Sequence, residues 1–105
     1  MSRQSKYNIV ISEAATQMLV SHAAFLAQVS PSAANRLTDE FEKVAKSLEH
    51  MPQRCPYLKD ECIDKNAYRF ILFENRYMLI FQIEDDTVYV EYMVDTRQDY
   101  GWLLS

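Results

Sequence analysis

Apolar residues recur at helical spacing over the stretch that follows Ser12. They stand three and four positions apart, so in a helix they share one face. Ser12 is a favourable N-cap, and Glu13 falls in the first turn, where the positive end of the helix dipole favours an acidic side chain. We therefore expect a first helix that turns an apolar stripe to the core, made of Ala15, Met18, His22, Phe25 and Val29.

A second helix is predicted directly after the first. Ser30 is its expected cap, and Pro31 suits the first helical position, where no backbone N–H is needed. The polar side of this helix carries charges of both signs, including Glu40 and Lys43. With so short a link, the helices must fold back on each other as an αα-hairpin. The expected buried stripe of the second helix is Ala34, Leu37, Phe41, Val44, Leu48 and Met51.

Four shorter runs have the composition of β-strands. Residues 7–11 precede the helices, and residues 67–73, 76–84 and 87–94 follow a crossing segment over residues 51–66 that has no clear period. The links between the last three runs are of hairpin length, so these strands are antiparallel neighbours. The whole 105-residue chain is thus predicted to be one α+β domain: an N-terminal strand, an αα-hairpin and a three-stranded antiparallel meander.

Alternation along the three C-terminal strands divides each of them into two faces. One set of each strand is wholly apolar, and we expect it to form the floor under the helices. The other set is interrupted by polar residues, namely Arg69, Gln82 and Glu91. The floor sets are Tyr68, Phe70 and Leu72, then Tyr77, Leu79, Phe81 and Ile83, then Val88, Val90, Tyr92 and Val94.

A sheet that is apolar on both faces needs a cover on the face away from the helices. A large apolar patch left in water usually marks a binding surface. The mixed face, or a groove beside it, is therefore a candidate site for a partner chain. Alternatively, the crossing segment and the C-terminal sequence YGWLLS fold over this face.

Composition and charge narrow the classes of function. The chain is 49% hydrophobic and 25% charged, with only one glycine and three prolines, as in a folded globular protein. Residues 1–52 carry five basic and five acidic side chains, whereas residues 53–105 carry six basic and ten acidic, which accounts for the net charge of −4. Proteins that grip nucleic acid normally show a basic footprint. The acidic sheet half therefore disfavours nucleic-acid binding.

The sequence predicts neither a membrane segment nor a metal site. No apolar run is long enough to span a bilayer, and the first residues lack the apolar stretch of a signal peptide, so we expect a cytoplasmic location. Cys55 and Cys62, with His50 nearby, do not match the spacing of a zinc site. We interpret both cysteines as plain thiols and expect no metal and no cofactor.

The order of the elements and three C-terminal motifs resemble the RelE/ParE superfamily of toxins, which belong to type II toxin–antitoxin (plasmid stabilisation) modules. The motifs are YRF at 68–70, RYMLIFQIEDD at 76–86 and VYVEYMVDTRQDY at 88–100, and the helical opening SEAA at 12–15 adds to them. The resemblance covers nearly the whole chain. It implies a growth-inhibiting toxin that a cognate antitoxin holds inactive by binding across its surface.

The resemblance implies one of two targets: mRNA on the ribosome, cut by RelE-like members, or DNA gyrase, blocked by ParE-like members. RNA cleavage needs 2′-OH activation, charge stabilisation at the phosphate and a proton for the leaving oxygen. If this chain is a ribonuclease, the resemblance places its catalytic residues at Arg69, Arg76, Arg97 and Tyr100. However, Met78 replaces a family arginine and Asp95 a family histidine, so the set is incomplete.

The same arginines also have structural interpretations. Arg69 can pair with Glu91 across the sheet, Arg76 flanks a turn, and Arg97 can pair with Asp95 or Asp99. The incomplete set and the acidic charge favour ParE-like inhibition of a protein target such as gyrase. The alternatives are a RelE-like, ribosome-dependent mRNA endoribonuclease and a non-toxic homologue that retains only antitoxin binding.

Overall fold

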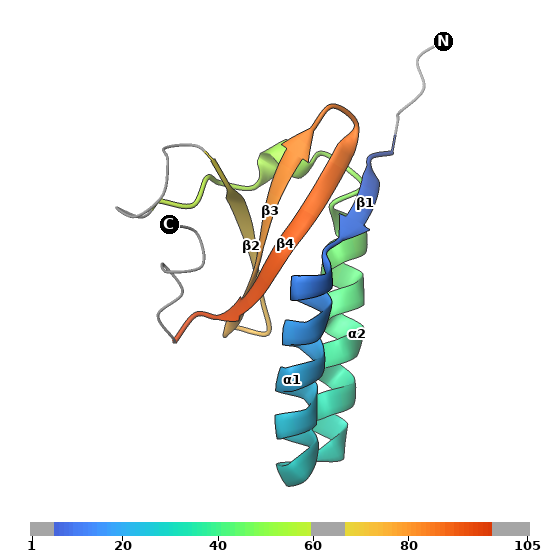
Figure 1. The fold of residues 1–105 in the computed structure, drawn as a ribbon, viewed down its shortest axis with the longest axis vertical. Coiled ribbons are helices and arrows are strands. Elements are labelled where there is room, and N and C mark those ends of the chain that lie inside the picture. The colour runs from blue at the N-terminus through green and yellow to red at the C-terminus, as the bar shows by residue number, and fades with distance from the viewer. Residues whose placement is uncertain (1–5, 60–66, 98–105) are drawn as a thin grey trace.

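The structure is a computed structural model that describes residues 6–59 and 67–97. It confirms the predicted α+β fold, with each strand beginning within two residues of its predicted start. A helical hairpin packs against one face of a sheet and continues past the end of that sheet (Figure 1). In chain order the elements are β1 (Asn8–Ile11), α1 (Glu13–Val29), α2 (Pro31–Ser47), the 3-10 turn η1 (Pro52–Arg54), β2 (Arg69–Phe73), β3 (Tyr77–Glu84) and β4 (Thr87–Asp95).

The four strands form one sheet in the order β1-β4-β3-β2. The three C-terminal strands are antiparallel, as predicted, and β1 adds to β4 in parallel, with Asn8 opposite Thr87. The β2–β3 turn places Glu74 and Asn75 at φ 54° and 59°. Two successive residues of positive φ give a turn whose twist matches that of the flanking strands. This tight turn fixes the pairing of Phe73 with Tyr77.

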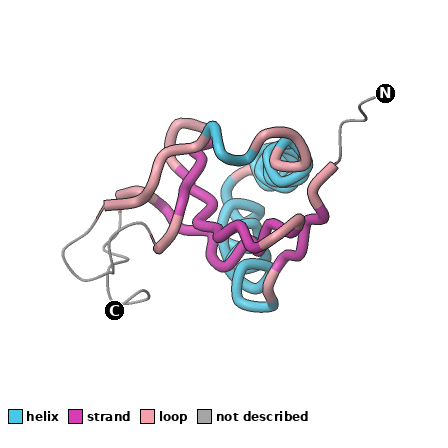
Figure 2. Tube along the Cα trace, turned by 90° about the horizontal axis from the view of Figure 1, so that it is seen from above, coloured by secondary structure: helices cyan, strands magenta, loops and turns pink. Residues whose placement is uncertain are grey.

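Both predicted caps are present at the helix N-termini. The Ser12 hydroxyl accepts a hydrogen bond from the backbone N–H of Ala15 at 2.9 Å, and the Ser30 hydroxyl accepts one from Ala33 at 3.2 Å. The prediction that α2 buries Met51 is wrong, because α2 ends at Ser47. Met51 has φ 49°, a left-handed conformation that cannot continue a right-handed helix. Its side chain is 67% exposed. Figure 2 shows the chain leaving α2 and running through η1 towards β2.

The core lies between the hairpin and the sheet, but the predicted face of β2 is wrong. Directly paired residues of antiparallel strands lie on the same face of the sheet. Phe73 pairs with Tyr77, which faces the helices, whereas Leu72 pairs with Met78 on the other face. The tight turn thus turns Ile71 and Phe73 to the helices and Phe70 and Leu72 away from them. The buried members of the core are Ala15, Leu37, Phe41, Ala45, Leu48, Cys55, Phe73, Tyr77, Leu79, Phe81, Val88, Val90 and Met93.

A β-bulge in β4 reverses the predicted faces of its second half. The register between β3 and β4 shifts at Ile80/Phe81, which pair with Tyr92 and Val90 and leave Glu91 as the extra residue. An extra residue inverts the alternation that follows it. Tyr92 and Val94, predicted as floor residues, therefore pack in the cluster on the open face. Met93 and Asp95 turn to the helix side instead.

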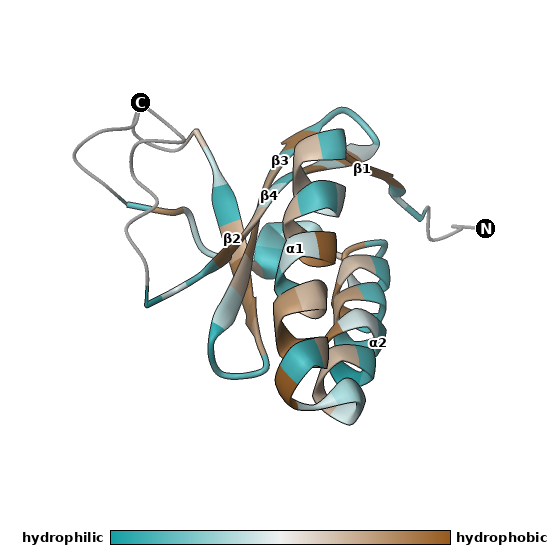
Figure 3. Ribbon diagram, turned by 60° about the horizontal axis from the view of Figure 1, so that its bottom comes forward, coloured by the Kyte–Doolittle hydropathy of each residue, from teal (hydrophilic) through white to brown (hydrophobic). Residues whose placement is uncertain are grey.

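The C-terminal half of α1 is more exposed than its apolar stripe predicts. Phe25 and Val29 are 62% and 79% exposed, so their assignment to the core is wrong. Leu26, the residue after Phe25, packs against the core, so Phe25 lies on another side of α1. The hairpin also continues past the end of the sheet (Figure 1). Hydrophobic segments continue to this end of α1, whereas the outer side of α2 is largely hydrophilic (Figure 3).

Candidate functional site

A buried carboxylate gathers two of the predicted site residues at one end of the sheet. Asp95, at the end of β4, has a side chain that is only 4% exposed. Its Oδ2 accepts a hydrogen bond from Nε of Arg76 at 3.1 Å, and its Oδ1 accepts one from the backbone N–H of Arg97 at 2.9 Å. The Arg97 guanidinium also bonds both carboxylate oxygens, at 3.3 Å each. The predicted Arg97–Asp95 pair is thus confirmed, and Arg76 joins it.

These contacts determine the charge states around Asp95. Hydrogen bonds from Arg97 and Arg76 outweigh burial and lower the pKa of Asp95 to about 2. On the helix side, the ring of His22 meets Tyr77 edge-on, with the ring centres 5.4 Å apart. Burial lowers the pKa of His22, although Asp95 acts in the opposite direction. At neutral pH the site therefore combines an ionised carboxylate, two guanidinium groups and a neutral imidazole.

Arg69 lies apart from this cluster and serves the crossing segment. Its guanidinium donates to the backbone oxygen of Cys55 at 2.7 Å and to the Tyr57 hydroxyl at 2.8 Å, and its central carbon lies 4.0 Å from the centre of the Tyr57 ring. The predicted pair with Glu91 is wrong, because Glu91 is the bulge residue of β4 whereas Arg69 pairs with Phe81 of β3. Arg69 thus anchors the segment that enters β2.

The predicted ribonuclease set is not assembled as one cluster. Arg69 pairs with Phe81, whereas Arg76 precedes Tyr77, the partner of Phe73. Because a β-strand rises about 3.3 Å per residue, the two arginines lie about 13 Å apart along the hairpin. Tyr100 lies outside the described residues. Among the described residues, Arg76 and Arg97 lie together because both pair with Asp95, whose negative charge neutralises one of their two positive charges.

The face of the sheet away from the helices is covered in part by the crossing segment. Met78, Ile80 and Val94 are at most 6% exposed and pack with Leu58 of that segment. Backbone bonds hold it there: Leu58 donates to the Tyr68 oxygen at 2.7 Å, and Phe70 donates to the Pro56 oxygen at 3.1 Å. The predicted alternative had two parts, and the part in which the crossing segment covers this face is therefore confirmed. The sequence YGWLLS lies outside the described residues.

Exposed apolar side chains remain on α1. Val20, Phe25 and Val29 are 59%, 62% and 79% exposed. Glu13 is the only charged residue of this 17-residue helix. A helix that faces water on one side normally carries charges there. The scarcity of charge in α1 is the sequence signal for this exposure. Phe25 and Val29 stand four positions apart and share one side of the helix, and we call these two residues the α1 surface.

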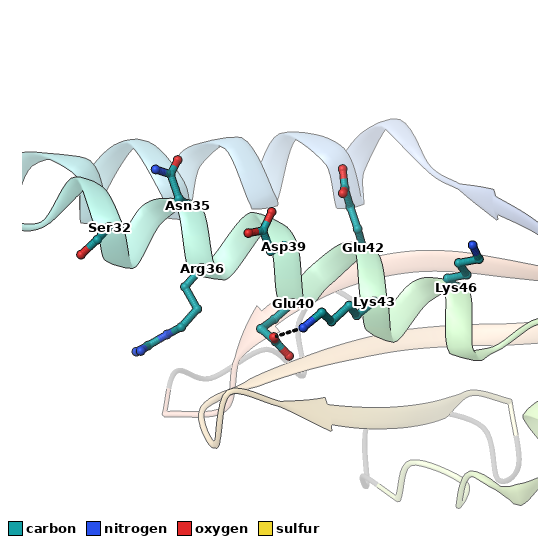
Figure 4. Close-up of a pocket in the computed structure, with 8 residues that line it drawn as sticks. All are labelled: Ser32, Asn35, Arg36, Asp39, Glu40, Glu42, Lys43 and Lys46. Atoms are coloured by element: carbon teal, nitrogen blue, oxygen red, sulfur yellow. Dashed lines mark hydrogen bonds and ion pairs between the residues drawn. The ribbon is translucent and has the colours of Figure 1, made fainter.

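The outer side of α2 has a shallow hollow of about 630 Å³ (Figure 4). All its lining residues come from one helix, and several point away from the body of the protein. Lys43 and Glu40 form an exposed ion pair at 3.2 Å, as solvated helix faces commonly do. We interpret this hollow as a hydrated surface. Its lining is Ser32, Asn35, Arg36, Asp39, Glu40, Glu42, Lys43 and Lys46.

Residues 6–59 and 67–97 contain no group of three metal-ligating side chains. Cys55 is a free, buried thiol, and burial raises its pKa, so it stays protonated. Cys62 lies outside the described residues. Within the same ranges, neither helix is long and apolar enough to cross a bilayer.

Two solved structures share this fold. A structure titled "Chromosomal ParDE TA system from P. aeruginosa" matches with a TM-score of 0.71 at 11% identity, over 86% of this chain and 96% of that one. The solution structure of a conserved hypothetical protein from Helicobacter pylori matches with a TM-score of 0.57 at 13% identity, over 88% of this chain and 97% of that one. No protein of curated function matches. At these identities the structural likeness establishes a RelE/ParE-like fold.

The family follows from the sequence match. Residues 9–100 match the model of the family described as "ParE toxin of type II toxin-antitoxin system, parDE". This range takes in most of β1, both helices and the three C-terminal strands. The chain therefore belongs to the ParE toxin family of type II toxin–antitoxin systems.

Proposed function

We propose that the chain inhibits a protein target, in the manner expected of a ParE-like toxin that acts on DNA gyrase, and that a cognate antitoxin neutralises it. The observation that best supports this proposal is the buried Asp95, which accepts hydrogen bonds from both Arg76 and Arg97. A phosphate-cleaving site needs positive charge available to the phosphate. Here an internal carboxylate already neutralises one of the two positive charges, and Arg69 lies elsewhere.

The packing on the open face also supports a non-nucleolytic function. Met78 and Ile80 fill the middle of β3 on that face and pack with Tyr68 and Phe70 of the neighbouring strand. These side chains offer no charge to a phosphate backbone. The match to the ParE family points in the same direction.

The α1 surface supports antitoxin binding. Exposed apolar groups that lie together on a surface usually mark an interaction site. An antitoxin helix can lie along α1 with its apolar side on Phe25 and Val29, as amphipathic helices do in hydrophobic grooves. We infer that this surface, rather than the covered sheet face, receives much of the antitoxin.

The direct test is a comparison of three activities of the purified chain. We expect it to inhibit supercoiling by purified gyrase, to leave mRNA intact on translating ribosomes, and to lose its inhibition when the product of the adjoining gene is added. A charge-neutralising variant, Arg97→Ala, provides the contrast. Ribosome-dependent cleavage that disappears in Arg97→Ala would establish the nuclease instead.

A chain that binds the adjoining gene product but inhibits neither gyrase nor translation would be a non-toxic homologue. That outcome would refute the toxic activity and retain the antitoxin partner. Growth after induction in cells, with plasmid supercoiling and total mRNA measured in parallel, distinguishes the same three cases.

A further inference from the structure

A small pocket lies where the tip of the helical hairpin approaches the β2–β3 turn. Its volume is about 190 Å³. Leu26 and Leu37 contribute an apolar wall from the two helices, and Glu74, Arg76 and Tyr77 contribute from the turn and β3. Arg36 of α2 lines the rim. We call this site the hairpin-tip pocket.

The local charge of the pocket is opposite to that of the chain. Arg36 pairs with Glu74 at 3.0 Å, and Arg76 pairs with Asp95, which also holds Arg97. Among the described residues, three guanidinium groups against two carboxylates leave one positive charge in excess, on a chain whose net charge is −4. Such a spot attracts an acidic group.

Arg36 has hydrogen-bonding capacity left for a ligand. A guanidinium group has five N–H donors. Within residues 6–59 and 67–97, Arg36 uses only Nε, which donates to Glu74, and its side chain is 71% exposed. Its two terminal nitrogens thus face solvent at the rim of an apolar pocket.

The pocket adjoins the α1 surface. The ring of His22 contacts Tyr77, which lines the pocket. Leu26 and Phe25 lie one helical turn further along α1, at the i+4 and i+3 positions from His22. Leu26 turns into the pocket, while Phe25 is 62% exposed. A chain that covers Phe25 therefore reaches the pocket without leaving α1.

We propose that the hairpin-tip pocket receives an apolar side chain of the antitoxin and that a neighbouring acidic side chain of the same segment binds Arg36 and Arg76. This inference rests on the proposed function, because it specifies the partner's chemistry at one end of the α1 surface. Charge complementarity selects the occupant: an acidic, apolar segment satisfies both the cationic rim and the apolar wall.

The test measures binding of the antitoxin purified as the product of the adjoining gene, at low and moderate salt. Arg36→Glu reverses the charge at the rim. Lys43→Glu is a matched control on the same helix, because Lys43 also forms an exposed ion pair, with side-chain exposures of 73% and 29% against 71% and 26% for the Arg36 pair. Lys43 lies about 10 Å along α2 from Arg36 and does not line the pocket.

We expect Arg36→Glu to weaken binding by about tenfold or more at low salt, and Lys43→Glu by about twofold or less, with the difference narrowing at moderate salt because Arg36 is exposed. Ala33→Phe fills the pocket without changing the charge and should weaken binding as well. Thermal melting of each variant reports folding, and Arg36→Gln replaces Arg36→Glu if the latter is unfolded.

Each result decides a separate point. If the wild-type chain does not bind this antitoxin, both the proposed function and the pocket inference are overturned. If it binds and Arg36→Glu behaves like Lys43→Glu, the pocket inference is refuted while the antitoxin partnership stands. If Arg36→Glu instead converts a self-associated wild-type chain to monomer in sedimentation, the occupant is a second copy and the inference is also refuted.

Discussion

Replacing Asp95 with asparagine removes the buried charge that holds the end of β4. The folded state lowers the pKa of this carboxyl from 3.8 to about 2. At about 1.4 kcal/mol per pKa unit, the ionised carboxylate stabilises the fold by roughly 2.5 kcal/mol at neutral pH. Asparagine keeps an oxygen for the Arg97 backbone N–H but loses the charge. We therefore expect Asp95→Asn to lower the free energy of unfolding by about 2–3 kcal/mol at pH 7.

The sign of the pH dependence follows from the lowered pKa. The contribution of Asp95 is complete above its unfolded pKa of 3.8 and disappears as the pH falls through about 2. At pH 3 roughly half of it, about 1.3 kcal/mol, should remain. The difference in stability between wild type and Asp95→Asn should therefore narrow steadily from pH 5 to pH 2.

Urea unfolding followed by circular dichroism at pH 7, 5, 4 and 3 measures this difference. Asp39→Asn is the control, because Asp39 lies on the exposed outer side of α2 and forms no ion pair within the described residues. We expect that control to change stability by less than about 0.5 kcal/mol at each pH. A constant difference between wild type and Asp95→Asn across the pH range would show that Asp95 stabilises the fold by packing alone and would refute the reasoning.

Four further substitutions test the fold. Phe41→Ala should lower the free energy of unfolding by about 3–5 kcal/mol in chemical denaturation, because Phe41 is 3% exposed. Phe25→Ala should lower it by under about 1 kcal/mol, because Phe25 is 62% exposed. Equal losses would contradict the core assignment. Ser12→Ala should lower the free energy of unfolding by about 1–2 kcal/mol in melting experiments, since the Ser12 hydroxyl caps α1 and donates to the backbone oxygen of Glu91 at 2.6 Å. An unchanged stability would show that these two hydrogen bonds do not stabilise the fold. Arg69→Ala should speed amide exchange at Leu58 and Phe70, because Arg69 anchors the crossing segment, and unaltered protection would exclude that role.

Local signals in the sequence predicted most of the fold. Ser12 and Ser30 marked both helix starts because their side chains satisfy N–H groups that a helix leaves unpaired. The short links between the C-terminal strands left only antiparallel pairing. The side chains of each strand that face the helices were harder to predict, because a set of apolar residues fits either face of a sheet that is buried on both sides. The tight turn at Glu74 and Asn75 decided it for β2, and its type depends on backbone angles that many sequences adopt.

The site was predictable only in part. The Arg97–Asp95 pair followed from two residues of separation, whereas the addition of Arg76 depends on the β-bulge at Glu91. Glu91 carries no local mark of a bulge, since neither glycine nor proline accompanies it. Phe25 is exposed whereas Leu26 packs against the core, and periodicity along one helix does not report which edge of the apolar stripe meets the sheet.

The position of β1 has a consequence for how the chain folds. β1 is the first strand in the sequence, yet it adds to β4, the last, so that Asn8 meets Thr87. Contacts between residues so distant in sequence are slow to form, because most of the chain must be ordered before the two ends meet. During synthesis, the sheet cannot be completed until β4 has left the ribosome. We therefore expect the β1 edge to close after the β2–β3–β4 meander has formed, and the sheet to gain its fourth strand in the final step.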